Sequence, residues 1–404
     1  MVTYKKPQPS YLCGKLFAQN RFSNLLSMAN SKPIAILKDK YKNKPVILVA
    51  SGPSLSKNID QLLSVKGKAL IIACDSAVVP LINRGIIPDY ITTVDFRAFT
   101  YKKLESVKDK LSDVYLIHIA ESTPEIPNKI KFKGIYYTSH PDEIGELLKN
   151  ILGESNAQQH DLTSVFHLAL FSAQVFGCSP IVFVGLDLSI SNGKDHVEGT
   201  VLDWGNSFEE NSDSIYVKGI DGDLIHTLSG FVDQKVICEQ LISSDPSLEY
   251  VDATEGGAFI QGTKVDKLSG VVDKLDKAYK VGIVEYTKTN PDYKKILYNL
   301  KLLRTKLLFL NRSMTEYNKH KKNINAYTPH KINKKIKKMN KITECMNCDE
   351  TMFYMREIVV AGYGDYINLK GIEQQVFVQR LRFEAIMFYI GLVDRQIEVF
   401  SNLG

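Results

Sequence analysis

Long hydrophobic runs are absent from this sequence, and cysteine is sparse. No stretch of about 18 consecutive apolar residues occurs among the 404 residues, so we expect no transmembrane segment. The opening MVTYKKPQPS lacks the apolar segment of a secretory signal. The six cysteines are scattered, and the single C-x-x-C, Cys345 to Cys348, has no second pair nearby to complete a zinc site. The sequence therefore predicts a reduced, cytoplasmic protein without a zinc site.

Positive charge is concentrated in one segment. The formal net charge is +6, yet residues 319–341 hold nine lysines and no Asp, Glu or Arg. Without these nine, 42 basic residues remain against 45 acidic ones, a net charge of −3. A slightly acidic body argues against a general nucleic-acid-binding surface, so we expect no nucleic-acid partner. The lysine-rich segment is interpreted as a solvated helix face, with a docking surface for an acidic protein or a membrane as the alternative.

Apolar, strand-like runs alternate with longer amphipathic segments between about residues 45 and 264. This alternation is typical of α/β folds, in which helices cover both faces of a mostly parallel sheet. Residues 1–44 are interpreted as a polar lead-in with a helix near residues 16–28, and residues 265–404 as a helical C-terminal domain. The expected strands are Val46–Ala50, Leu70–Cys74, Tyr90–Val94, Val114–Ile119, Ile135–Thr138 and Ile181–Leu186.

The region after residue 264 shows helical periodicity. Apolar residues recur at spacings of three and four from Val265 to Tyr279, and again from Tyr293 to Leu310. Asn290-Pro291 is expected to cap and start the second of these helices. Ile332–Met339 and the segment from about 371 to 400 complete the predicted helical bundle.

Residues 214–228, SIYVKGIDGDLIHTL, predict a β-hairpin that turns at Asp221-Gly222. The Asp-Gly pair is the residue pair that such a turn prefers, and its flanks alternate as strands do. We therefore interpret Asp221-Gly222-Asp223 as a turn and not as a D-x-D metal site.

Small polar or acidic residues follow four of the six expected strands. Ser51–Ser54 follow the first strand, Asp75 the second, Asp95 the third and Asp187 the sixth. Ligands of open parallel sheets bind at the carboxyl ends of the strands. Four such strand ends favour a polar pocket at this edge over a coincidence of helix caps.

The turn after the first strand, in VILVASGPSLSKNID (46–60), has the residues of an anion site. Gly52 permits a close backbone approach, Pro53 fixes φ, and Ser54 can cap the helix that follows. The N–H groups of a helix N-terminus suit a phosphate. The stretch matches neither of the common phosphate-binding motifs, G-x-x-x-x-G-K-[ST] and G-x-G-x-x-G, so a plain strand–helix turn is the alternative.

Three stretches together resemble the motility-associated factor (Maf) family of bacterial flagellin glycosyltransferases: VASGPSL (49–55), GLDLSISNGKDHVEG (185–199) and DATEGGAFIQGT (252–263). The core is also similar to bacterial sialyltransferases that use CMP-activated sugars, which carry a G-P-S-L turn and a Thr-Ser pair that opens a helix. The resemblance covers about residues 45–265. It implies a Rossmann-like α/β core of the nucleotide-sugar glycosyltransferase type, with an appended helical C-terminal bundle that docks the acceptor.

The resemblance further implies transfer of a nonulosonic acid, of the pseudaminic, legionaminic or sialic type, from a CMP-sugar to Ser or Thr of flagellin. No cofactor is expected, because a monophosphate leaving group needs less neutralising charge than a pyrophosphate. The residues implied to bind the CMP donor are Ser51, Gly52, Pro53, Ser54, Asp75, Asp95, Thr163 and Ser164.

Transfer requires a base that takes the proton of the acceptor hydroxyl. His196, in a glycine-bracketed loop beyond Asp187, is the first candidate, and Glu255 and Asp187 are the other two. The structural alternatives are a surface-loop histidine for His196 and a capping acid for Glu255.

Asp75 and Asp95 depart from the sialyltransferase pattern, which has Asn at both positions. Acids repel a phosphate unless they bind hydroxyls, amines or a cation, so the metal requirement stays open. If Asp75, Asp95 and Asp187 bound magnesium, the core would suit a pterin pyrophosphokinase. The third alternative is a non-catalytic protein that binds flagellin.

Overall fold

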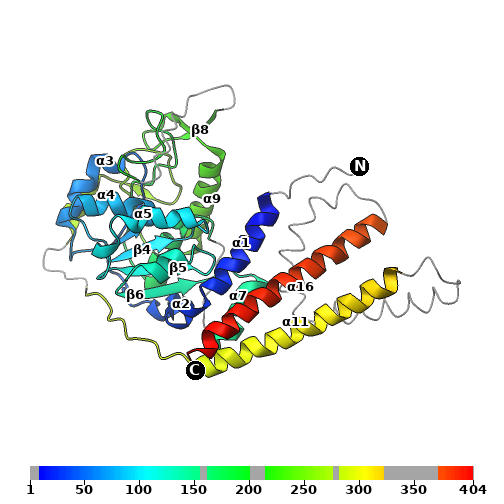
Figure 1. Cartoon of the computed structure of the whole chain (residues 1–404). Helices are drawn as coiled ribbons and strands as arrows, with labels where there is room; N and C mark the ends of the chain where they lie inside the picture. The colour runs from blue at the N-terminus through cyan, green and yellow to red at the C-terminus, as the bar shows by residue number, and fades with distance from the viewer. Residues whose placement is uncertain (1–8, 155–161, 201–213, 276–281, 323–371, 404) are drawn as a thin grey trace. The chain divides into compact units, whose positions relative to one another are not determined.

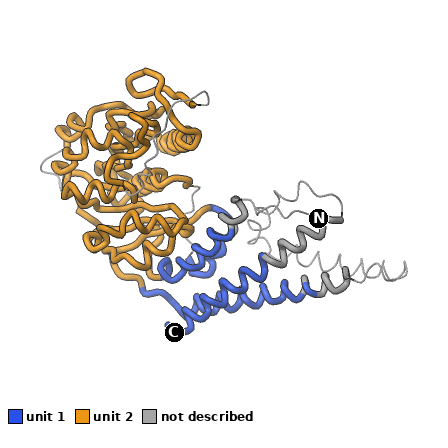
Figure 2. The backbone as a smooth tube through the Cα atoms, turned by 45° about the horizontal axis from the view of Figure 1, so that its top comes forward, with its two compact units in different colours: residues 1–29, 141–155, 290–404 blue, residues 30–140, 156–289 orange. Residues whose placement is uncertain are grey.

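The computed structural model describes residues 9–154, 162–200, 214–275, 282–322 and 372–403. The chain divides into two compact units, each built from separate segments (Figure 2). We call Asn30–His140 with Asn156–Thr289 the sheet unit. We call Met1–Ala29 with Pro141–Ser155 and Asn290–Gly404 the helical unit.

A nine-stranded sheet forms the centre of the sheet unit (Figure 1). Its order is β1-β6-β5-β4-β3-β2-β7-β10-β11, and each neighbouring pair is parallel. The chain proceeds from β2 towards one edge through β6 and then returns to the other side of β2, so the winding direction reverses between β2 and β7. All six predicted strands are present, and the predicted α/β fold class is confirmed. The strands are β1 Lys32–Pro33, β2 Val46–Val49, β3 Leu70–Cys74, β4 Tyr90–Thr93, β5 Tyr115–Ile119, β6 Gly134–Thr138, β7 Ile181–Val184, β10 Tyr250–Asp252 and β11 Lys264–Val265.

Helices cover both faces of this sheet, and each face has its own apolar core. Alternate strand residues point to opposite faces. Leu48 and Ile72 belong to the core that packs against α8 and α9, whereas Ile47 and Ile71 belong to the core beneath α4, α5 and α10. The α-helices of this unit are α3 Leu55–Asn58, α4 Val78–Asn83, α5 Lys102–Glu105, α6 Glu125–Lys129, α8 Val165–Phe176, α9 Ser229–Ser244 and α10 Leu268–Lys274. Its 3-10 helices are η1 Ile34–Leu37, η2 Ile59–Ser64, η3 Asp75–Ala77, η4 Ala98–Tyr101 and η5 Lys108–Lys110.

The predicted hairpin is confirmed. Strand β8 (Ile215–Lys218) pairs antiparallel with β9 (Leu224–Thr227), and Gly222 in the turn adopts φ of 93°. The hairpin is tied to the loop after β7, because the Ile190 N–H donates to the carbonyl of His226 at 2.9 Å.

The helical unit is built around two long helices, α11 (Tyr293–Lys322) and α16 (Ile372–Ser401). They run antiparallel, since Tyr293 at the start of α11 contacts the ring of Phe400 at the end of α16. Arg304 and Asp394 form an ion pair of 2.5 Å between them. Helices α1 (Pro9–Ser23), α2 (Leu25–Ala29) and α7 (Glu143–Leu152) complete the described part of this unit.

The two units divide the chain differently from the sequence-based domains of 1–44, 45–264 and 265–404. Residues 30–44 and 265–289 belong to the sheet unit, and residues 141–155 belong to the helical unit. The periodic stretch from Val265 to Tyr279 does not form one helix, because Val265 pairs in β11 and α10 ends at Lys274.

Helix α11 begins two residues later than the sequence indicated. The Asp292 carboxylate accepts a hydrogen bond of 2.9 Å from the Lys295 N–H, so Asp292 and not Asn290 caps the helix. Ile332–Met339 and the Cys345–Cys348 pair lie outside the described residues. Within the described part of the chain, every helix is too short or too polar to span a bilayer.

The packing of α11 against α16 gives a matched test of the helical periodicity. Leu300 is fully buried on α11, whereas Leu302, two residues later, is half exposed. Leu300→Ala should lower the free energy of unfolding by about 2–5 kcal/mol, because it removes buried contacts and leaves a cavity. Leu302→Ala should change it by about 0.5 kcal/mol or less. Urea unfolding followed by circular dichroism measures both, and equal losses would contradict the described packing.

Candidate functional site

The three stretches that carry the family resemblance meet at Asp187. Its carboxylate accepts a hydrogen bond of 3.0 Å from the Ser54 N–H and one of 2.6 Å from the Ser54 hydroxyl, across 133 residues of sequence. Its carbonyl accepts a bond of 2.7 Å from the Ala258 N–H. A Cβ atom on Gly52 would collide with the Asp187 carboxylate, and one on Gly257 would collide with its backbone. Asp187 therefore explains why both positions are glycine.

The turn after β2 is already occupied by this carboxylate. Its donors are engaged within the chain, because the Gly52 N–H binds the backbone carbonyl that follows β7 and Ser54 binds Asp187. Pro53 has no N–H to offer. Helix α3 has only four residues, and the Ser54 side chain does not cap it. These contacts contradict the prediction that Ser54 caps the helix, and binding of a phosphate by this turn stays a prediction.

Two buried carboxyl groups, those of Asp187 just after β7 and Asp252 at the end of β10, influence each other electrostatically. Burial raises the pKa of Asp187, and the hydrogen bonds from Ser54 and the charge of Lys57 oppose this rise. Burial also raises the pKa of Asp252, to about 6. Hydrogen bonds from Thr254 lower the pKa of Asp252, while the negative charge of Asp187 raises it. This part of the edge therefore disfavours further negative charge.

Glu255 has the capping role that the sequence offered as its structural alternative. Its Oε1 accepts hydrogen bonds from the Leu268 N–H at 3.2 Å, at the start of α10, and from Asn58 Nδ2 at 3.3 Å. Its carbonyl accepts a bond of 2.7 Å from Lys57 Nζ, and its backbone adopts φ of 61°. Glu255 thus joins the loop after β10 to α10 and to the region of α3.

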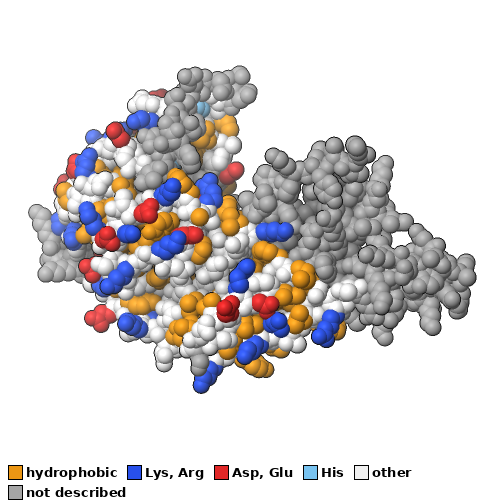
Figure 3. Space-filling view, in the orientation of Figure 1, with side chains coloured by type: hydrophobic (Ala, Val, Ile, Leu, Met, Phe, Trp, Pro, Cys, Tyr) orange, Lys and Arg blue, Asp and Glu red, His pale blue; other side chains and the backbone are white. Residues whose placement is uncertain are grey.

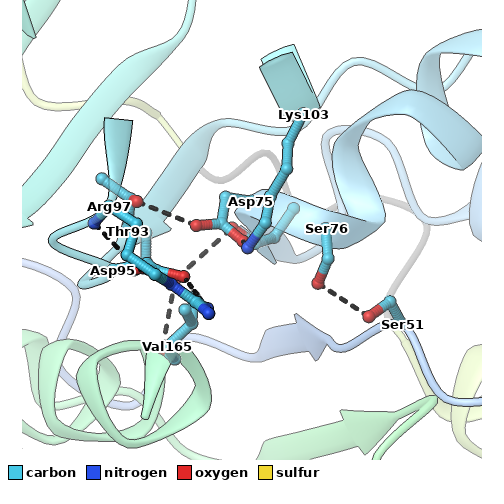
Figure 4. Close-up of polar contacts among 10 residues, drawn as sticks. Ser51, Asp75, Ser76, Thr93, Asp95, Arg97, Lys103 and Val165 are labelled. Carbon is cyan, nitrogen blue, oxygen red and sulfur yellow. Dashed lines mark hydrogen bonds and ion pairs between the residues drawn. The ribbon is translucent and has the colours of Figure 1, made fainter. Parts of the chain in front are cut away.

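A polar cluster lies at the carboxyl ends of β2, β3 and β4 (Figure 4). Asp75 is fully buried, and its two carboxylate oxygens accept bonds from Lys103 Nζ at 3.0 Å and from the Thr93 hydroxyl at 2.8 Å. Lys103, on α5, is itself buried. The hydroxyls of Ser51 and Ser76 lie 2.7 Å apart beside this group. The negative charge of Asp75 is therefore compensated by a lysine of the same chain.

Asp95, after β4, is compensated in the same way. Arg97 holds it through two side-chain bonds, from Nε at 3.0 Å and from Nη2 at 2.7 Å. Burial raises the pKa of Asp95, but its bonds and charge interaction with Arg97 lower it more, so the net pKa lies below the usual range. The Arg97 side chain is 63% exposed, so its guanidinium lies at the surface of the cluster while it is bonded to Asp95.

The Thr163–Ser164 pair opens α8 next to this cluster. The Ser164 hydroxyl accepts a bond of 3.2 Å from the His167 N–H and so caps the helix, and the Thr163 hydroxyl lies 3.3 Å from His167 Nδ1. The Thr92 hydroxyl, at the end of β4, donates to the Val165 carbonyl at 3.3 Å. The amino end of a twelve-residue helix is thereby held at the carboxyl edge of the sheet.

His196 is brought to the same edge. The N–H of Val197, the next residue, donates to the Ser51 carbonyl at 2.7 Å and anchors this loop over the end of β2. His196 Nδ1 lies 2.9 Å from Asp195 Oδ1, and both side chains are about one quarter exposed. Burial raises the pKa of Asp195, but His196 lowers it more, so the net pKa falls below the usual range. The arrangement is a histidine paired with a carboxylate at the rim of the edge.

Sequence reasoning missed the partners of the predicted residues. Lys103 and Arg97 compensate the two acids, and Asp195 pairs with His196, but none of them stands directly at the end of a strand. Asp252 ends a strand of only three residues, too short to be recognised by its apolar run. Among the described residues, no three His, Cys, Asp or Glu side chains gather as metal ligands. Basic and acidic side chains are interspersed over the face of the sheet unit drawn in Figure 3.

A pocket of about 350 Å³ opens at the opposite, amino-terminal edge of the sheet. None of the predicted site residues lines it. Its charged residues are mixed in sign, and Asp266 and Lys274 pair within it at 2.8 Å. The polar cluster and this pocket are therefore separate features of the sheet unit.

The buried Asp252 predicts a specific dependence of stability on pH. Its pKa of about 6 in the folded state exceeds its unfolded value near 4, so the folded state holds the proton more tightly. The contribution of Asp252 to the free energy of unfolding is complete below about pH 4 and is lost as the pH rises through about 6. Asp252→Asn removes this loss, so the variant should gain up to about 3 kcal/mol relative to the wild type across this window.

Unfolding by urea at several pH values measures this gain. Asp60→Asn is the control, because this surface carboxyl is two-thirds exposed and should leave the pH dependence unchanged. A constant difference between Asp252→Asn and the wild type from pH 4 to 7 would contradict the assignment.

Comparisons with known proteins agree with this architecture. Residues 19–193 match the family described as MptE-like, 6-hydroxymethylpterin diphosphokinase MptE-like. A solved structure of a Maf glycosyltransferase from Magnetospirillum magneticum AMB-1 is similar, with a TM-score of 0.60 and 16% sequence identity. The match covers 98% of this chain and 61% of that one, so this chain spans less than two thirds of its length. A comparison with curated proteins finds no match. The chain thus carries an MptE-like segment within a fold similar to that of a Maf glycosyltransferase, and this fold agrees with the resemblance noted from its sequence.

Proposed function

We propose that this protein is a glycosyltransferase that moves a nonulosonic acid from a CMP-sugar to Ser or Thr of flagellin. The similarity to the Maf glycosyltransferase supports this proposal because it extends over 98% of the chain and so includes the helical unit. The MptE-like match, in contrast, ends at residue 193, before β10 and before both long helices. An enzyme that modifies a protein can use a helical unit of this size to bind its acceptor, whereas a kinase of a small molecule has no protein acceptor to bind.

The observation that carries the proposal is the internal compensation of the acids. Asp75 is bound by Lys103 and Asp95 by Arg97, so neither needs a divalent cation to balance its charge. Asp187 is bound by Ser54. Magnesium in phosphoryl-transfer sites is held by carboxylates together with the phosphates of the substrate. These three acids fit metal-free departure of a nucleoside monophosphate better than transfer of a pyrophosphate.

The donor binds, in this proposal, over the polar cluster at the ends of β2 to β4. Its phosphate lies near the amino end of α8, where the first N–H groups have no acceptor within the helix and the helix dipole favours an anion. Arg97, which is bonded to Asp95, supplies a cation beside it. Ser51, Ser76 and Thr163 offer hydroxyls to the ribose and the base. This proposal therefore places the phosphate at the amino end of α8, and not at the turn after β2 where the sequence indicated it.

His196 acts as the base in this mechanism. The bond between the anomeric carbon and the phosphate oxygen breaks, and its electron pair leaves with CMP. The acceptor oxygen forms the new bond to the anomeric carbon through an oxocarbenium-like transition state. Its proton passes to His196, and the negative charge of the adjacent Asp195 carboxylate stabilises the resulting imidazolium.

The alternative is transfer of pyrophosphate from ATP to a pterin, which the name of the matching family favours. It requires Asp75, Asp95 or Asp187 to exchange its present partner for magnesium. Isothermal titration calorimetry with CMP, and with ATP and magnesium, separates the two functions.

In such titrations, Arg97→Ala should weaken CMP binding at least about tenfold, equivalent to about 1.4 kcal/mol, because it removes the cation beside the phosphate. Arg84→Ala is the matched control, since Arg84 is an exposed arginine that pairs with Asp60 away from the cluster. CMP should bind equally well after magnesium is removed with a chelator. Binding of ATP but not CMP, together with magnesium-dependent turnover of a pterin, would assign the alternative function.

The intact mass of flagellin co-expressed with this protein and a nonulosonate pathway tests the transfer itself. The mass should rise by whole nonulosonic acid units with the wild type. His196→Ala should lower the rate of transfer roughly a hundredfold or more, and Asp195→Asn by a smaller factor, with CMP affinity unchanged in both. Glu255→Gln should retain transfer, because Glu255 caps α10. Loss of transfer in Glu255→Gln, with normal rates in His196→Ala, would move the role of base to Glu255.

A further inference from the structure

Helix α11 carries a second apolar stripe on the side that faces away from α16. The buried seam of the helix consists of Ile296, Leu300, Leu303, Leu307 and Leu310. Tyr298, Leu302 and Phe309 are apolar or aromatic too, yet 66%, 48% and 53% of their surfaces are exposed. These three large side chains are therefore not part of the buried core of the helical unit.

The three residues lie on one line along the helix. Leu302 follows Tyr298 by four residues, and Phe309 follows Leu302 by seven, so at 3.6 residues per turn they fall within about 40° of each other. Spacings of four and seven are those by which one helix packs against another. α16 covers the opposite side of α11, and α7 covers a third side, where Asn299 Nδ2 donates to the Asn150 carbonyl at 3.1 Å.

Basic side chains border the stripe on both sides. Lys294, Lys301 and Arg312 lie along one border, and Lys295 and Lys306 lie along the other, all of them exposed. Acidic residues are nearly missing from α11, which contains Glu316 alone. Hydrophobic and basic side chains lie next to one another in the area of α11 on the face drawn in Figure 3. The stripe and its borders form one surface, which we call the α11 surface.

We propose that the α11 surface docks an acidic amphipathic helix of a partner protein. The apolar stripe of that helix packs on Tyr298, Leu302 and Phe309, and its acidic residues pair with the lysines and the arginine on both borders. Charge complementarity selects this occupant, because a second copy of α11 would place the same basic rows against each other. A membrane surface is disfavoured, because helices that lie in a bilayer interface bury a much wider apolar face than one of about 40°.

A designed helix tests this inference without reference to any enzymatic activity. The probe is a fluorescent peptide of three heptads with leucine at positions a and d and glutamate at e and g. The control peptide has lysine in place of each glutamate and keeps the same apolar seam. The full chain should bind the acidic peptide, bind the basic peptide at least about tenfold more weakly, and lose affinity as salt rises.

Variants of the chain locate the binding. Leu302→Glu with Phe309→Glu, and separately Lys301→Glu with Lys306→Glu, should each weaken binding of the acidic peptide at least about tenfold. All four side chains are exposed, and helix content measured by circular dichroism should be unchanged. Leu224→Glu is the matched control, since Leu224 is an apolar residue that is 74% exposed on β9 of the other unit, and its binding should equal that of the wild type.

Four results would overturn the inference. The first is that the acidic peptide does not bind the full chain, and the second is that both peptides bind with equal affinity. The third is that both double variants still bind the acidic peptide. The fourth is that a second copy of the chain or a lipid surface occupies the α11 surface. The last result would appear as dimerisation in sedimentation that Leu302→Glu with Phe309→Glu abolishes. It would appear equally as binding to phosphatidylserine vesicles that this double variant abolishes while peptide binding persists.

Discussion

One buried carboxylate, that of Asp187, joins the carboxyl edge of the sheet at its centre. It lies where the winding direction reverses between β2 and β7, and both of its hydrogen bonds come from Ser54. A buried charge is costly unless it is bonded, so the N–H and the hydroxyl of Ser54 are what make this position tolerable. Gly52 and Gly257 follow from the same carboxylate, because a side chain at either position would occupy its space. The close approach of the loops after β2, β7 and β10 thus depends on this carboxylate.

Much of the fold could be predicted from the sequence because its signals are local. Each of the six expected strands is a short apolar run between more polar segments, and all six are found. The other three strands, β1, β10 and β11, were not predicted, since two or three residues are too few to show a period. The helix expected from Val265 onward failed because a period of three and four also fits a short strand followed by a single short helix. The start of α11 was predicted two residues too early, because the neighbouring Asn290-Pro291 pair also fits a helix start. In the structure the Asp292 carboxylate caps the helix by accepting a bond from the Lys295 N–H.

The acidic residues of the candidate site could be predicted from the sequence, whereas the side chains that pair with them could not. Acidic residues just beyond the strands, Asp75 and Asp95, could be placed at one edge by parallel topology alone. Their cations, Arg97 and Lys103, both come from the segment that follows β4, and nothing in the local sequence distinguishes them from the basic residues of the surface. These two cations nevertheless determine what the site can do. A carboxylate in an ion pair positions its neighbours, whereas an unpaired carboxylate is available to bind a metal ion. The paired acid beside His196 escaped prediction for the same reason, since adjacency in sequence does not reveal which side chains point together.

Helix α7 follows β6 in the chain but belongs to the helical unit, as α1 does. Both helices pack against segments that lie beyond the sheet unit in the sequence: Phe22 of α1 packs against Tyr389 on α16, and the Asn150 carbonyl of α7 accepts a hydrogen bond from Asn299 on α11. During translation, α1 and α7 therefore complete their packing only after α16 and α11 have been synthesised, so the helical unit cannot finish folding before the whole sheet unit has been made.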